Sequence, residues 1–293
     1  MKHYFNTNKV LSVTALAIGA ITIFFACKKD DKAGADNTRD NQTIAAATQE
    51  AEINAIYEDA FSVTLDYNTT ESDLNGGNRK APDATWNNYA RCTGVGLSIV
   101  PANWETYPKV VTIDFHEGCT DDHGRTRKGK LIITVDKIFV SPGAQAVVTF
   151  DNYSVNDIKV EGTQTIQNLS SDAGFGYSYT IVDGKLTYPS GKKVTYSGNR
   201  NVLQKEGATT PWVILDDIYE LTGSASLKDS SVIANVTIKS GLVRKISCPY
   251  ISKGVVELMV NSFKASIDYG NGDCDKKAVL TVGDKTKEIE LPR

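Results

Sequence analysis

Residues 96–291 consist mainly of short segments in which polar and apolar side chains alternate, such as Tyr177 to Ile181 and Asn235 to Lys239. Successive side chains of a strand point to opposite faces of a sheet. Alternation therefore predicts strands with one buried face and one face in water, which is typical of antiparallel sheets. Turn sequences such as Asp183-Gly184 separate the segments. No helical pattern lies between them, so repeated βαβ units are excluded.

The sequence thus predicts a mainly β fold, a long antiparallel meander that forms a curved sheet, an open barrel or a sandwich. The predicted strands are 96–100, 109–115, 130–139, 144–152, 157–168, 175–188, 192–205, 218–227, 232–239, 242–247, 254–269, 278–282 and 286–291.

One helix is predicted before the strands, over residues 43–61, because apolar residues recur there at spacings of three or four. Residues 66–85 are polar around Gly76-Gly77 and predict a long loop. We expect residues 43–293 to form a single β-rich domain, with antiparallel strands over 91–293.

The amino terminus has the composition of a secretory signal peptide. Lys2 and Lys9 precede an uncharged apolar run over residues 10–26, and the small residue Ala26 ends it before Cys27. A basic start, an apolar middle and a small residue at the cleavage site predict a signal peptide over residues 1–26. The alternative is an uncleaved transmembrane helix, which needs about 20 apolar residues.

The end of this leader, Phe24-Phe25-Ala26-Cys27, resembles the lipobox of bacterial lipoproteins. The resemblance implies that Cys27 is the lipidated residue. Lys28-Lys29-Asp30-Asp31 then resembles the export signal of surface lipoproteins of the Bacteroidetes group. We therefore expect an outer-membrane lipoprotein of the cell envelope that faces the cell surface, with a periplasm-facing lipoprotein as the alternative. Residues 27–42 are predicted to be a lipidated, disordered tether.

Four later segments resemble a family of β-rich secreted lipoproteins of Bacteroidetes, a family of unknown function. They are CTDDHGRTRKGKLIITV, TFDNYSVNDIKVEGT, DGKLTYPSGKKVTYSGNR and IDYGNGDCDKKAVLTV. The resemblance implies a compartment and a β-rich architecture, and it supplies no catalytic residue.

The cysteines after Cys27 are expected to form disulfides, because the envelope is oxidising. An internal repeat suggests how they pair. Residues 111–135 and 265–282 each contain Ile-Asp-aromatic, a glycine-containing turn, a cysteine near an aspartate, and then a strand. Each repeat has a second cysteine at a similar distance before it. We therefore predict the pairs Cys92–Cys119 and Cys248–Cys274.

Histidine and aspartate gather in two loops, where they are the candidates for metal ligands. The residues are His116, His123, Asp121, Asp273 and Asp275. Neither loop has the spacing of a zinc protease motif or of an EF-hand, so we predict no metal site and no cofactor.

The charge balance and the motifs together limit the function. The chain has 32 Lys and Arg against 35 Asp and Glu, without the basic excess that nucleic-acid binding requires. No Gly-x-Ser-x-Gly motif is present. We predict a non-catalytic domain that binds a ligand or partner of unknown identity, for which a glycan and a protein are the candidates. The alternatives are an envelope glycan hydrolase and a periplasm-facing carrier of a lipid or another hydrophobic ligand.

Overall fold

The computed structural model describes residues 36–75 and 94–291, apart from 104, 122–123, 140, 211–214 and 249. Fourteen strands form one antiparallel sheet, in which each strand pairs with its sequence neighbours and only the short β3 lies off this path, beside β4. The strands are β1 (Gly96–Val100), β2 (Lys109–Asp114), β3 (Cys119–Thr120), β4 (Thr126–Val135), β5 (Gln145–Val155), β6 (Ile158–Asn168), β7 (Gly176–Thr187), β8 (Lys193–Glu206), β9 (Ile218–Lys228), β10 (Ile233–Lys245), β11 (Ile251–Val260), β12 (Phe263–Asn271), β13 (Lys277–Val282) and β14 (Lys285–Glu290). The predicted mainly β meander is confirmed.

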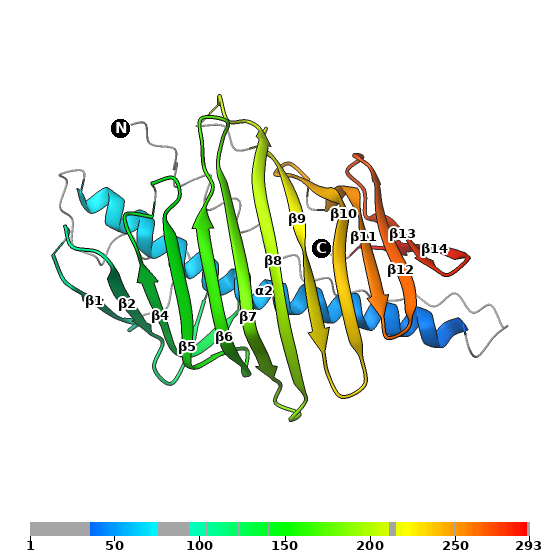
Figure 1. The fold of residues 1–293 in the computed structure, drawn as a ribbon, viewed down its shortest axis with the longest axis horizontal. Helices are drawn as coiled ribbons and strands as arrows, with labels where there is room; N and C mark the ends of the chain where they lie inside the picture. Colours follow the sequence, from blue (N-terminus) through cyan, green and yellow to red (C-terminus); the bar gives the residue numbers. More distant parts are fainter. Residues whose placement is uncertain are drawn as a thin grey trace.

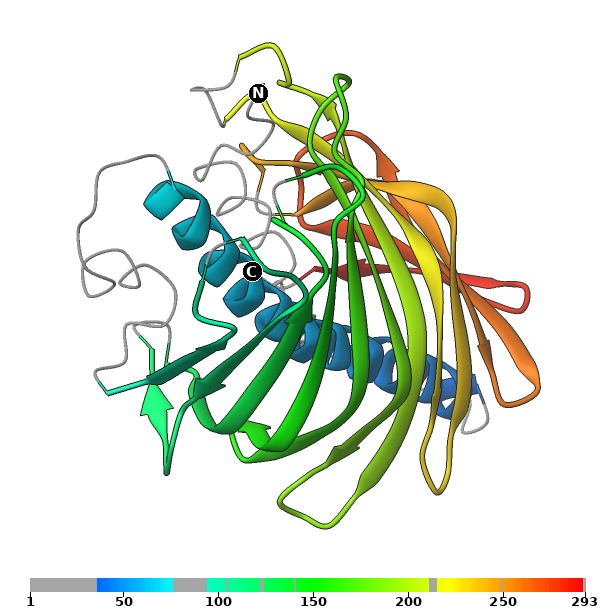
Figure 2. The same ribbon diagram turned by 60° about the vertical axis from the view of Figure 1, so that its left-hand side comes forward.

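The sheet is open, and it curves around a single long helix, α2 (Asp36–Asn75) (Figure 1). Strands β1 and β14 are its two edges. Figure 2 shows the helix running along the concave side of the sheet. Of the three forms that the sequence allowed, the curved sheet is the one adopted. Within the described residues, no helix is both long and apolar enough to cross a membrane.

The helix is longer at both ends than the predicted 43–61. It includes residues 36–42, which were assigned to the tether, and residues 66–75, which were assigned to a loop. The reason is compositional: neither glycine nor proline occurs between residues 36 and 75, and Gly76-Gly77 follows directly. Glycine is common after the last turn of a helix, since it adopts left-handed backbone angles without strain. Residues 1–35, including the predicted signal peptide and Cys27, lie outside the described residues.

Two strand predictions were wrong. The segments 232–239 and 242–247 form one strand, β10, which absorbs the residues between them as an irregularity in its pairing with β9 and β11. Residues 254–269 form two strands instead, β11 and β12. The turn between them contains Asn261 at a φ of 50°, a conformation that asparagine tolerates better than most residues.

The hydrophobic core lies between the helix and the concave face of the sheet. Ile53, Tyr57 and Phe61 of α2 are fully buried there. Inward-pointing rings of the central strands cover them, and the centroids of the Phe61 and Tyr177 rings are 4.2 Å apart. A long open sheet thus buries one face by packing on one helix.

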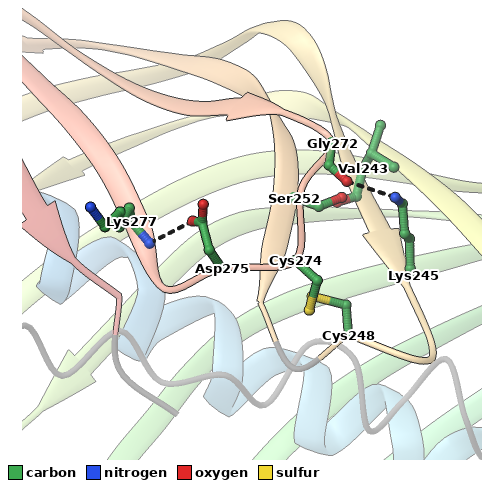
Figure 3. Close-up of a disulfide and its surroundings, with 8 residues drawn as sticks. All are labelled: Val243, Lys245, Cys248, Ser252, Gly272, Cys274, Asp275 and Lys277. Carbon is green, nitrogen blue, oxygen red and sulfur yellow. Dashed lines mark hydrogen bonds between the residues drawn. A yellow bond between two sulfur atoms is a disulfide. The ribbon is translucent and has the colours of Figure 1, made fainter.

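A disulfide joins Cys248, after β10, to Cys274, between β12 and β13 (Figure 3). This confirms the second predicted pair. Close to it, Lys245 Nζ donates to the carbonyl of Gly272 at 2.6 Å, so the same two segments are linked twice. Cys119 is also disulfide-bonded; its predicted partner, Cys92, lies outside the described residues.

Candidate functional site

A buried charged cluster links the helix to β4. Asp59 of α2 accepts hydrogen bonds from Arg127 at 2.7 and 2.5 Å. Arg125 Nη1 lies 2.7 Å from the same carboxylate, and Asp121 lies 3.1 Å from both arginines. Burial alone lowers the pKa of the Arg127 guanidinium, but the hydrogen bond and charge of Asp59 raise it overall. Two carboxylates and two guanidinium groups therefore neutralise one another inside the fold.

A second buried cluster links the helix to β7 and β8. Glu50 is paired with Arg200, and the Tyr179 hydroxyl donates to Glu58 at 2.9 Å. Burial raises the pKa of the Glu58 carboxyl to about 7, although the hydrogen bond from Tyr179 and the charge of Arg200 act against this rise. All four side chains are buried. The ion pair and the hydrogen bond therefore join the helix to the sheet at buried positions.

The convex side of the sheet carries the opposite pattern. The outward positions of β6 to β10 align in cross-strand rows of hydroxyl and amide side chains. The middle row is Thr165, Thr180, Asn199, Ser224 and Thr237, each paired in register with the next. One flanking row is Gln167, Ser178, Asn201 and Thr222. The other is Thr163, Val182, Ser197, Ser226 and Asn235, with a bulge between Val182 and Ser197. We call these three rows the polar face.

Every side chain of the polar face is partly or fully exposed, and none of them is charged. Charged pairs lie beyond it at both ends of the strands: Glu161 with Lys185 at 3.2 Å and Lys205 with Glu220 at 3.3 Å. Among the described residues, the only side-chain hydrogen bond within the polar face is the one that Asn199 accepts from the backbone N–H of Ser224, at 3.3 Å. Its other hydroxyls and amides therefore have their donors and acceptors open to the solvent side.

A pocket of about 340 Å³ adjoins the polar face. It forms where β7 bulges between Ile181 and Gly184, with Asp183 at a φ of 53°. A bulge leaves a residue unpaired and bends its strand, and residues on both sides of this one line the pocket. The pocket is lined by Asp183, Gly184, Lys185, Thr195, Tyr196, Ser197, Ser226 and Lys228. Ser197 and Ser226 belong to the polar face as well, so the pocket and the face form one continuous surface.

The four predicted candidates for metal ligands that lie within the described residues do not form one group. Asp121 forms ion pairs with Arg125 and Arg127. The exposed His116 lies 3.5 Å from Asp114. His123 lies outside the described residues. Asp273 and Asp275 line a second pocket of about 280 Å³. In the described part of the chain, no group of three or more His, Cys, Asp or Glu side chains could hold a metal ion.

The fold and the site define an open antiparallel sheet around one helix, with a filled concave side and, on the convex side, a polar face without charged side chains. Comparison with protein-family models, with curated proteins and with solved structures gave no match. The polar face was not predicted from the sequence. Its signal was present at alternate positions between residues 163 and 237, where the polar residues of the strands are mainly Thr, Ser, Asn and Gln.

Proposed function

We propose that this chain is an outer-membrane lipoprotein, anchored through a lipid on Cys27 and displayed at the cell surface, whose β domain binds a ligand without transforming it. The binding site in this proposal is the polar face with the adjoining pocket. The observation that carries the proposal is the set of exposed hydroxyl and amide side chains that have no side-chain partner within the described residues. The leader and the resemblance of the Lys28-Lys29-Asp30-Asp31 segment to surface export signals support the anchor and the address.

The second pocket supports binding over hydrolysis. Glycoside hydrolysis needs two carboxyl groups about 5 to 10 Å apart in an open site. Of the carboxylates that line this pocket, Asp268 and Asp275 each accept from a backbone N–H of their own turn, and Glu288 pairs with Lys277 at 3.1 Å. Three of the four carboxylates that line this pocket therefore have structural partners, the fourth being Asp273, and the polar face itself carries no carboxylate.

The filled concave side favours binding on the outside over transport of a lipid. A carrier needs an apolar cavity large enough for its ligand. In this fold the helix α2 occupies the concave side, and its Tyr57 and Phe61 rings pack against strand residues where such a ligand would lie.

The anchor and the display are tested in cells. We expect labelled palmitate to be incorporated into the wild-type protein and not into a Cys27→Ala variant, which should leave the membrane fraction. Protease added to intact cells should degrade the wild-type domain. Complete protection until the outer membrane is opened would show that the domain faces the periplasm.

Catalysis is tested separately, by incubating the purified protein with envelope glycans and measuring the reducing sugar released. We expect none above the level of a boiled sample. Release that disappears in an Asp273→Asn variant would establish the hydrolase instead.

A further inference from the structure

We infer that the polar face binds an uncharged glycan chain, with one sugar unit of that chain in the pocket beside Asp183. This inference rests on the proposed binding function and names its ligand class.

The hydrogen-bonding groups of the polar face match those of a sugar. A Ser or Thr hydroxyl is both a donor and an acceptor, and an Asn or Gln side chain carries both kinds of group at adjacent atoms. Sugar hydroxyls have the same dual character. A surface such as Thr180, Asn199 and Ser224 can therefore satisfy a polyol whichever way each hydroxyl points.

The polar face carries no charge. Nucleic acids and acidic glycans are bound through Lys and Arg, and no such residue lies within the three rows. Two lysines line the pocket: Lys185 is paired with Glu161 at 3.2 Å, and Lys228 shares the pocket with the carboxylate of Asp183. Protein interfaces use aromatic and large apolar anchors at their centre. The polar face has one apolar side chain, Val182, which is 52% exposed. A neutral, highly hydroxylated ligand is the class that remains.

The polar face is also long enough for a chain of sugars. Neighbouring strands lie about 4.8 Å apart, so the middle row from Thr165 to Thr237 is roughly 20 Å long. That length suits several linked sugar units better than one. The pocket of about 340 Å³ lies near the lower limit of roughly 300 Å³ for small-molecule sites.

The pocket supplies the groups that would orient one unit. Asp183 and Lys228 line it together with the hydroxyl-bearing residues Thr195, Ser197 and Ser226. A carboxylate accepts hydrogen bonds from sugar hydroxyls and an ammonium donates to them, and such charge-assisted bonds are shorter and stronger than neutral ones.

The test is affinity electrophoresis of the protein, purified from membranes in a detergent without a sugar head group. The gels contain neutral polymers, namely α- and β-glucans, mannan, xylan and galactan, or the anionic polymers polygalacturonate and heparin. We expect at least one neutral polymer to retard the protein, and the retardation to persist in 0.5 M NaCl, because no ion pair holds the complex.

Two double variants locate the site. Thr180→Ala with Asn199→Ala removes adjacent side chains from the middle row, and the loss of two ordinary hydrogen bonds weakens binding roughly ten- to thirtyfold. Thr281→Ala with Thr286→Ala removes paired outward threonines of β13 and β14, outside the polar face, and should leave binding unchanged. Both variants should unfold at nearly the same temperature as the wild type.

The remaining outcomes overturn the inference. If no neutral polymer retards the protein, the polar face does not bind a neutral glycan. The same conclusion follows if the variant of the polar face binds as well as the control variant. Retardation only by an anionic polymer, lost in Lys228→Ala and in high salt, would also overturn it. In that last case the domain still binds a ligand, as proposed, but the ligand belongs to a different class. If the domain is not displayed at the surface, the proposed location is wrong, and the glycan result is unaffected.

Discussion

The Glu58→Gln substitution should make the protein more stable at neutral and alkaline pH. Glu58 is 5% exposed, and its carboxyl accepts a hydrogen bond from the Tyr179 hydroxyl at 2.9 Å. Burial raises the pKa of this carboxyl to about 7 from the ordinary value of 4.5. In the folded protein Glu58 is therefore protonated below pH 7, whereas in the unfolded chain it ionises above pH 4.5. Glutamine keeps the shape and accepts the same bond from Tyr179, but it cannot ionise.

The change in stability with pH follows from proton linkage. Because the folded-state pKa is the higher one, the stability contributed by Glu58 is complete below pH 4.5. It is lost as the pH rises from 4.5 to about 7, and above that it stays lost. The difference between the two pKa values corresponds to about 3 kcal/mol in the free energy of unfolding. We expect the wild type to lose on the order of this amount between pH 4.5 and 8, and the variant to lose much less.

The assay is urea unfolding at pH 4.5, 6 and 8, followed by far-ultraviolet circular dichroism with the disulfides intact. Carboxyls whose pKa is lowered, such as Asp229 at about 2 and Glu161, act below this range and do not interfere. The matched control is Glu50→Gln, which removes the charge paired with the buried Arg200 and should destabilise the protein throughout. Equal pH dependence in the wild type and in Glu58→Gln would refute the reasoning.

Three further substitutions test other parts of the fold by the same urea unfolding. Asp59→Ala leaves the buried Arg127 without its main counterion and should cost about 3 to 5 kcal/mol; a loss below 1 kcal/mol would contradict the role of this cluster. Replacing Cys248 with serine opens the disulfide to Cys274, whose sequence separation is 26 residues, and should cost about 3 kcal/mol. A wild-type sample treated with reductant should lose at least as much, since it also opens the Cys119 disulfide. Gly129→Ala places a Cβ atom only 2.2 Å from a backbone oxygen of β5, at a φ of 75°, and should destabilise by more than about 1 kcal/mol.

The strands were predictable because alternation and turn signals act locally. The register in which the strands pair was not predictable, because a bulge shifts the register. In β7, Tyr177, Tyr179 and Ile181 are buried at odd positions, whereas Leu186 is buried at an even one. The bulge before Gly184 changes which positions face inward. The sequence contains Asp183-Gly184 as a turn signal, and a local analysis cannot distinguish a turn that ends a strand from a bulge within one. The pocket beside the polar face depends on that difference.

The ends of the helix, 36–42 and 66–75, were missed because they are mostly polar, and the buried polar residues within the predicted span 43–61 were missed as well. Hydrophobic periodicity detects apolar side chains that recur on one side of a helix. Here Glu50, Asn54 and Glu58 also recur every four residues, and they face the sheet: Tyr196 donates to Asn54 at 2.8 Å, and Tyr179 donates to Glu58. Polar residues at buried positions weaken the apolar stripe, although their partners more than 100 residues later make their burial favourable.

These buried polar pairs also explain how one helix finds a single position on so long a sheet. Apolar contacts alone change little when a helix slides by one turn, because the concave face is lined by aliphatic and aromatic side chains along much of its length. A slide of one turn would move Glu50 away from Arg200 and Asp59 away from Arg127. Each separation leaves a buried charge without its partner, at a cost of about 3 to 5 kcal/mol. We infer that the two charged clusters, which hold α2 at Glu50 and at Asp59, fix both the position and the direction of the helix, while the apolar side chains around them supply most of the stability.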